Sequence, residues 1–144
     1  MNIEIITSNL PLNIFGFDSV AINKDYAGTA FKLSGKMWEI VKLNNVKNKG
    51  KNIWVYESGD KVFAGVEPEN DVNGNSYGLE KKEIILEKYA YYKHIGPYSL
   101  IKQSGQNMTS QLVSQGFEVV LPYIEIYATG QAMKLNRKQS LSCV

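Results

Sequence analysis

The sequence predicts an α+β fold in which a unit of strand, helix, strand and strand occurs twice and builds one antiparallel sheet with two helices on one face. Residues 53–59, Ile-Trp-Val-Tyr-Glu-Ser-Gly, share their apolar and turn positions with residues 124–130, Ile-Glu-Ile-Tyr-Ala-Thr-Gly. Upstream of each segment lies a helical pattern that contains Ser-Gly, at residues 34–35 and 104–105. The chain has 144 residues, the length of one domain or of two small repeats that share a core. The predicted single domain, residues 1–144, divides into repeat one at about 12–67, a loop at 68–82, and repeat two at about 84–144.

The first repeat is predicted to begin with a strand near Asn13 to Ile22. A helix from about Thr29 to Leu43 follows, because apolar side chains recur there at helical spacing. The cluster Ser58-Gly59-Asp60-Lys61 favours a turn, so the segments Trp54 to Glu57 and Val62 to Glu67 are predicted to form a hairpin around it.

The second repeat is predicted to follow the same order, starting with a strand near Ile84 to Ile95. Its helix begins at Pro97, a residue suited to the first helical turn, and ends before Gly116, a natural stop. The segments from Tyr123 to Thr129 and from Gln139 to Val144 are predicted to form the second hairpin. The Asn, Asp and Gly residues between the repeats predict a loop.

A glycine lies at a matching position in each predicted helix. Gly35 and Gly105 would each cost about 1 kcal/mol relative to alanine in a helix interior. We therefore expect each helix to pack closely against another backbone at its glycine, across a pseudo-twofold axis.

Composition excludes several classes of function. The net charge of +2 and the lack of a long Lys/Arg run give no basis for direct binding to nucleic acid. No apolar segment is long enough to span a bilayer, and the N-terminus lacks the features of a signal peptide. His94 and Cys143 are the only residues of their kinds, so we expect no metal site, no cofactor and no internal disulfide. The chain is expected to be cytoplasmic.

The segment Pro122 to Tyr127 is the strongest candidate for a functional strand. Side chains in a strand alternate between faces, so Tyr123, Glu125 and Tyr127 point one way and the isoleucines between them point the other. A carboxylate framed by aromatic rings attracts an apolar cation, because the ring faces add to the attraction of the charge. The alternative is a strand with one solvated face, which produces the same alternation.

The repeat relates Trp54 to Glu125 and Tyr56 to Tyr127. If a twofold axis relates the halves, an indole and a carboxylate face one central cavity, and the two tyrosines flank it. Burial of Glu125 in an apolar cavity would raise its pKa, because desolvation disfavours the charged form.

Three segments resemble motifs of one known family. Tyr89 to Tyr98, Tyr-Ala-Tyr-Tyr-Lys-His-Ile-Gly-Pro-Tyr, looks like its strand followed by a helix that opens with His-x-Gly-Pro-Tyr. Pro122 to Tyr127 looks like its Pro-x-x-Glu-x-Tyr strand, and Gly65 to Glu67 looks like the strand that closes its first repeat. From about residue 12 to residue 144, the chain resembles the GyrI-like, or AraC-type, effector-binding family, which includes the ligand-sensing domains of multidrug-responsive transcription regulators.

The resemblance implies a duplicated βαββ fold with one curved sheet and a ligand cavity between the repeats. It also implies that Glu125 contacts lipophilic cations, such as drugs or dyes, with broad specificity. Aromatic side chains surround this acid in the family, and the candidates here are Tyr26, Trp38, Trp54, Tyr56, Tyr92 and Tyr127. The regulators carry a DNA-binding domain ahead of this one, whereas this chain starts almost directly at the domain. We therefore expect a stand-alone binding protein that does not bind DNA itself.

Two other functions remain open at this level. Glu125 with Tyr127 or Tyr92 could serve a hydrolase of strained electrophilic small molecules, in which a carboxyl of raised pKa positions water and protonates the leaving group. The name-giving family members act on DNA gyrase, so a protein-interaction role is the other alternative, and a separate DNA-binding chain could complete a sensor. Glu67 is a second acid that we expect at the surface rather than in the cavity.

Overall fold

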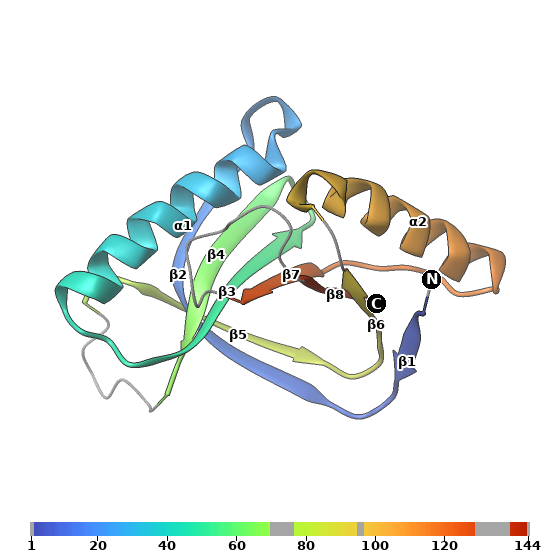
Figure 1. Ribbon diagram of the computed structural model, residues 1–144, viewed down its shortest axis with the longest axis horizontal. Coiled ribbons are helices and arrows are strands. Elements are labelled where there is room, and N and C mark those ends of the chain that lie inside the picture. Colours follow the sequence, from blue (N-terminus) through green and yellow to red (C-terminus); the bar gives the residue numbers. More distant parts are fainter. Residues whose placement is uncertain (1, 70–76, 95–96, 129–138, 144) are drawn as a thin grey trace.

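The computed structural model describes residues 2–69, 77–94, 97–128 and 139–143 as one antiparallel sheet with two helices on one face (Figure 1). The elements in chain order are β1 (Glu4–Ile6), β2 (Leu10–Val20), a 3-10 turn (Ile22–Lys24), α1 (Tyr26–Leu43), β3 (Asn48–Glu57), β4 (Lys61–Pro68), β5 (Glu80–Leu86), β6 (Tyr89–His94), a second 3-10 turn (Tyr98–Leu100), α2 (Ile101–Ser114), β7 (Tyr123–Ala128) and β8 (Gln139–Cys143). The strand order is β1-β6-β8-β7-β3-β4-β2-β5. The predicted fold class is confirmed.

The sheet order shows the duplication directly. The unit β2-α1-β3-β4 and the unit β6-α2-β7-β8 meet where β3 pairs with β7, so that the same order of strands runs outward from this junction on both sides. The short strands at the two edges are exchanged between the units. β1 leads into β2 but pairs with β6, whereas β5 leads into β6 but pairs with β2. The edge strand beside each unit is therefore the segment that leads into the first strand of the other unit.

The predicted strand from Ile84 to Ile95 is two strands. Residues 87 and 88 interrupt it, and β5 and β6 on either side pair with different partners. The periodicity could not show this, because both strands contribute to one apolar run. β5 begins at Glu80, inside the segment predicted as a loop. Residues 70–76 of that loop, residues 95 and 96, and the interior of the second hairpin at 129–138 lie outside the described residues.

Helix α1 begins at Tyr26, three residues before the predicted start. The Asp25 side chain accepts a hydrogen bond from the backbone N–H of Gly28 at 3.1 Å, which satisfies one of the free donors at the helix start. The apolar stripe then packs the helix on the sheet through Ala30, Met37 and Val41, which are buried at helical spacing. Helix α2 packs through Ile101, Met108 and Leu112 in the same way.

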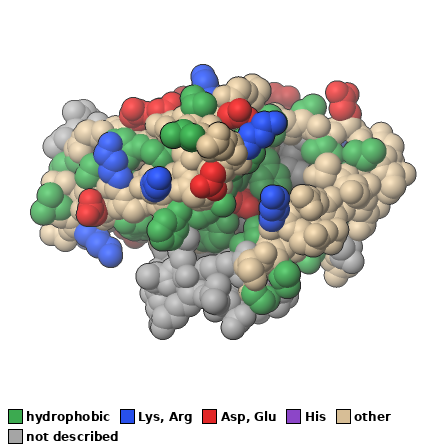
Figure 2. All heavy atoms as spheres, turned by 90° about the horizontal axis from the view of Figure 1, so that it is seen from above, with side chains coloured by type: hydrophobic (Ala, Val, Ile, Leu, Met, Phe, Trp, Pro, Cys, Tyr) green, Lys and Arg blue, Asp and Glu red, His purple; other side chains and the backbone are tan. Residues whose placement is uncertain are grey.

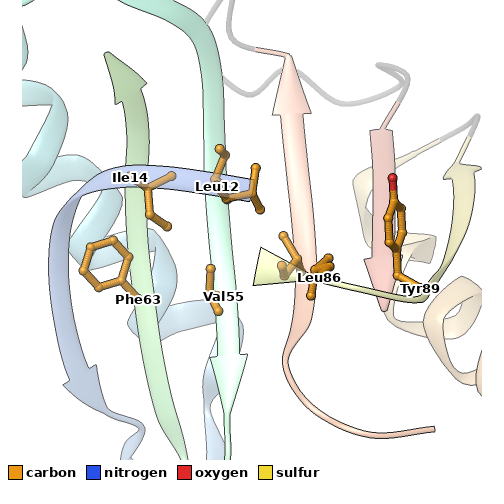
Figure 3. Close-up of a cluster of buried hydrophobic side chains, with 8 residues drawn as sticks. Leu12, Ile14, Val55, Phe63, Leu86 and Tyr89 are labelled. Atoms are coloured by element: carbon orange, nitrogen blue, oxygen red, sulfur yellow. The ribbon is translucent and has the colours of Figure 1, made fainter. Parts of the chain in front are cut away.

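The sheet curls strongly, and its face away from the helices encloses a core of its own (Figure 3). Ile14 on β2 shares a buried cluster with Ile124 on β7, although the order β7-β3-β4-β2 would separate them by about 14 Å in a flat sheet. Gly16 and Gly65 pair directly across β2 and β4, and a Cβ on Gly16 would overlap the Ala64 carbonyl oxygen. Two glycines at this point therefore let the strands approach closely enough to curl.

The expected contact between helix glycines and a neighbouring backbone is wrong. A Cβ built on Gly35 has no heavy atom within 4 Å, whereas one built on Gly105 meets the side chain of Tyr123. No helix in the described part of the chain is long and apolar enough to cross a membrane.

Candidate functional site

The candidate site lies on the pair of strands at the centre of the duplication. β3 and β7 pair so that Trp54 lies directly opposite Glu125. These are the two positions that the sequence repeat matches, so the pseudo-twofold axis passes through this pair. Alternation places Ile53 and Ile124 on the other face, in the core of the curled sheet. The helix side of the sheet thus receives an indole and a carboxylate at its centre.

The Glu125 carboxylate is buried and held by two phenols. Tyr56 donates a hydrogen bond to Glu125 Oε1 at 2.6 Å, and Tyr127 donates to the same oxygen at 3.0 Å. Only 7% of the Glu125 surface is exposed. Tyr56 comes from the other repeat, so the twofold arrangement supplies one donor from each half.

Burial decides the protonation behaviour of this group. Desolvation raises the pKa of Glu125 above its ordinary value of 4.5, and the hydrogen bonds from Tyr56 and Tyr127 offset only part of that rise. Burial also raises the pKa of Tyr56, and the neighbouring charge of Glu125 raises it further. The Tyr56 phenol therefore keeps its proton and acts as a donor at any physiological pH.

Aromatic rings form a continuous wall around the acid. The rings of Trp54 and Tyr127 lie 4.6 Å apart at an interplanar angle of 54°. Those of Tyr56 and Tyr123 lie 5.8 Å apart at 37°, and Tyr26 meets Tyr56 edge-on at 6.2 Å. The centroid distances of all three ring pairs, and their inclined ring planes, are typical of favourable aromatic contacts. These contacts fix the orientation of the two phenols that hold Glu125.

The wall lines part of an open cavity of about 1200 Å³. It lies between the first turn of α1, the turn between β3 and β4, the strands β3 and β7, and one side of α2. Figure 2 looks down on the helix side and shows the surface hollowed between the two helices, with apolar side chains inside the hollow. Phe31 and Leu121 line the cavity and are more than half exposed, which places them at its rim. The volume exceeds that of a typical pocket for one drug-sized ligand, roughly 300–1000 Å³.

A hydrogen bond closes one side of the rim. The Tyr26 hydroxyl donates to Asp60 Oδ1 at 2.6 Å and so ties the start of α1 to the tip of the β3–β4 hairpin. The backbone N–H of Ala21 donates to the Asp60 carbonyl oxygen at 2.8 Å and reinforces this link. Two connections to one turn residue hold the hairpin tip against α1.

Five of the seven predicted site residues line the cavity: Tyr26, Trp54, Tyr56, Glu125 and Tyr127. Trp38 does not, contrary to the expectation. It packs with Phe15 and Val66 near the other end of α1. Twelve residues separate it from Tyr26, which is about 18 Å along a helix axis.

Tyr92 also lies outside the cavity lining. The strand register places it in one row with Leu141 and Glu125, two strands away from the acid, or about 10 Å. Its side chain packs against two apolar clusters, one that contains Trp54 and Tyr127 and one under α2 that contains Met108 and Leu112. Glu67 pairs with Lys49 at 3.4 Å and is not among the residues that line the cavity.

Sequence reasoning missed several lining residues. Tyr123 was predicted to share the face of Glu125 but was not named as a ligand contact, and it lines the cavity beside Gly105. Phe31 and Ile101 also line it. Ile101 belonged to an apolar stripe that predicts only a helix packed on a sheet, and Phe31 lay outside the stripe of its helix. Alternation along β7 was the one signal that identified Tyr123.

Comparison with known proteins finds similarity at the level of structure only. No family model matches the chain, and no curated protein matches its sequence. The fold is similar to that of SAV2435 bound to tetraphenylphosphonium, with a TM-score of 0.67, 14% identity, and coverage of 99% of this chain and 93% of the other.

Two further solved structures share the arrangement. A protein from Staphylococcus aureus MU50 assigned to bacterial transcription regulation has a TM-score of 0.58 and 15% identity over 99% of this chain and 97% of its own. A hydrolase from Listeria innocua has a TM-score of 0.54 and 12% identity over 98% and 89%. At these identities the comparisons establish a shared fold.

Proposed function

We propose that this protein binds lipophilic cationic small molecules with broad specificity and that Glu125 is the counter-ion of the bound cation. The observation that carries the proposal is a buried carboxylate that faces an aromatic cavity and has no cationic partner among the described residues. None of the ion pairs among the described residues includes Glu125. A buried acid held only by phenols is costly when ionised, and a cation in the cavity would remove that cost.

The expected interaction energies favour a cation over a neutral ligand in this cavity. At 4 Å and an effective dielectric constant of 20, a cation and a carboxylate attract by about 4 kcal/mol. Each ring face adds roughly 0.5–2 kcal/mol to the binding of a cation placed above it. After the ordering costs of association, a binding free energy of about −8 kcal/mol, or micromolar affinity, is consistent with these terms.

Broad specificity follows from the kind of groups that line the site. Ring faces and a buried carboxylate select for size and for the sign of the charge, but they require no particular pattern of hydrogen bonds in the ligand. SAV2435, whose fold is similar, is bound to tetraphenylphosphonium, a cation of this kind. We therefore also propose that the chain belongs to the GyrI-like effector-binding family and sequesters or senses such compounds.

Calorimetric titration tests the proposal with one cation and one neutral compound of similar shape, tetraphenylphosphonium and triphenylphosphine oxide. We expect Glu125→Gln to weaken the cation at least about 100-fold, because most of the 4 kcal/mol attraction is lost. The neutral compound should change by less than about threefold. Glu67→Gln is the matched control, since Glu67 lies on β4 outside the cavity. Equal losses for both compounds in Glu125→Gln would contradict the role of the charge.

Hydrolysis of strained electrophilic small molecules is the second candidate function, because a hydrolase from Listeria innocua shares the fold. In that reaction Glu125 would accept a proton from water, the water oxygen would attack the electrophilic carbon, and the bond to the leaving atom would break. Glu125 would then return the proton to that atom. A small epoxide provides the test. Catalytic turnover would support this function, whereas protection of at most one equivalent per protein would support binding alone.

A further inference from the structure

The two helix glycines have opposite surroundings, although the repeat places them at matching positions. A Cβ built on Gly105 would lie 2.6 Å from the hydroxyl oxygen of Tyr123 and 3.3 Å from its Cζ. A Cβ built on Gly35 meets nothing within 4 Å. Side-chain carbons do not approach an oxygen to 2.6 Å, so a larger residue at position 105 requires Tyr123 or α2 to shift, and the tip of the Tyr123 side chain moves at lower cost than the helix backbone. The contact with Tyr123 therefore requires a glycine at position 105, whereas no such contact requires a glycine at position 35.

Tyr123 has little freedom to move except toward the cavity. Its ring packs on Tyr56 at 5.8 Å, and it borders the buried cluster that contains Met108 and Leu112. Tyr56 is itself held in place by its hydrogen bond to Glu125. Gly105 and Tyr123 both line the cavity. A shift of the Tyr123 hydroxyl away from α2 therefore enters the space beside Glu125.

We propose that Gly105 determines the size class of the ligand: by letting the tip of Tyr123 lie against the backbone of α2, it keeps the cavity wide enough for bulky cations that carry several aromatic rings. This inference rests on the proposed function. A methyl group at position 105 displaces the Tyr123 hydroxyl into the cavity and narrows it without removing the charge of Glu125. The site then still accepts a small cation that carries one ring.

The test compares Gly105→Ala with the matched control Gly35→Ala. Tetraphenylphosphonium is the bulky probe, and benzyltrimethylammonium is the small one. We expect Gly105→Ala to weaken tetraphenylphosphonium by roughly 10- to 100-fold, the usual range for an overpacked contact, and benzyltrimethylammonium by less than about threefold. Gly35→Ala should leave both affinities unchanged.

A double variant relieves the most severe part of the clash and provides the decisive check. Gly105→Ala combined with Tyr123→Phe lacks the hydroxyl oxygen that the new methyl group would overlap, so the nearest remaining atom is Cζ at 3.3 Å. We expect it to regain tetraphenylphosphonium binding to within about threefold of the Tyr123→Phe single variant. If Gly105→Ala alone does not fold, recovery of folding and binding in the double variant still supports the inference, and failure to recover overturns it.

The outcomes separate the two proposals. Unchanged tetraphenylphosphonium affinity in Gly105→Ala, or equal losses for the two cations, would overturn the role of Gly105 and leave the proposed function intact. A wild-type protein that binds neither cation would overturn the proposed function and the inference with it.

Discussion

The dependence of cation binding on pH is the sharpest consequence of a buried Glu125. Desolvation raises the pKa of this carboxyl above its ordinary value of 4.5, and a bound cation favours the ionised form. The affinity for a cation should therefore be constant at high pH and fall tenfold per pH unit below the pKa of the free protein. With an attraction of about 4 kcal/mol, the total fall between ionised and protonated Glu125 is roughly 1000-fold.

The direction of proton exchange provides an independent check. Because the cation lowers the pKa of Glu125, binding releases about half a proton at the pKa of the free protein, and the release approaches one proton at lower pH, between the pKa values of the free and bound forms. Titration calorimetry with tetraphenylphosphonium, in buffers of different ionisation enthalpy from pH 4 to pH 8, measures both the affinity and the number of protons released. Glu125→Gln should show a low affinity that does not vary with pH. A wild-type affinity that is flat over this range, or that rises in acid, would refute the reasoning.

Two further predictions concern the groups around the acid and the core below it. Tyr56→Phe removes the 2.6 Å hydrogen bond to Glu125, which favours the charged form of the carboxyl by roughly 1.5–3 kcal/mol. The pH below which the affinity for the cation falls should therefore be higher in this variant. An unchanged pH dependence would show that the hydrogen bond does not stabilise the charged form of Glu125. Ile14→Ala should lower the free energy of unfolding by about 2–5 kcal/mol in chemical denaturation, because Ile14 is fully buried in the core of the curled sheet. Ile85→Ala, at a position that is 65% exposed, should cost less than about 0.5 kcal/mol, and similar losses in the two variants would contradict the assigned core.

The duplication gives the site its shape, but the proposed function requires that the two halves differ. The pseudo-twofold axis passes between positions 54 and 125, which lie directly opposite each other. Opposed residues in a pair of strands have Cβ atoms about 4.5–5.5 Å apart, so two carboxylates at these positions would repel each other and one would stay protonated. Trp54 replaces the second acid with a ring that packs on Tyr127. Among the described residues that line the cavity, Glu125 is therefore the one buried charge beside an aromatic wall, whereas the charged side chains of Lys24, Asp25, Glu57, Asp60 and Lys102 are more exposed.

Several parts of the site could be predicted because they depend on local rules. Alternation along a strand placed Tyr123, Glu125 and Tyr127 on one face, and the internal repeat matched Trp54 with Glu125. The antiparallel register of β3 and β7 then brought that matched pair into direct contact. When a twofold axis relates two repeats, the two strands that meet at the axis are expected to pair through matched positions.

Other parts could not be predicted, because they depend on distance in three dimensions. Trp38 is aromatic and near the right helix, but its position along α1 places it beside Phe15. Tyr92 shares a row with Glu125, yet β8 lies between their strands. Sequence patterns give the face of an element, and they do not give the number of strands or helical turns between two side chains.

Taken alone, the sequence determined the fold class, the existence of two repeats, and the identity of the acid at their junction, because periodicity and internal similarity report which residues share a face. Only the tertiary structure decided that the edge strands are exchanged, that the sheet curls around Gly16 and Gly65, and that a Cβ on Gly105 would meet Tyr123 while one on Gly35 would meet no heavy atom within 4 Å. Those features arise from packing between segments far apart in the chain. Such packing depends on volume and register, which no local pattern records.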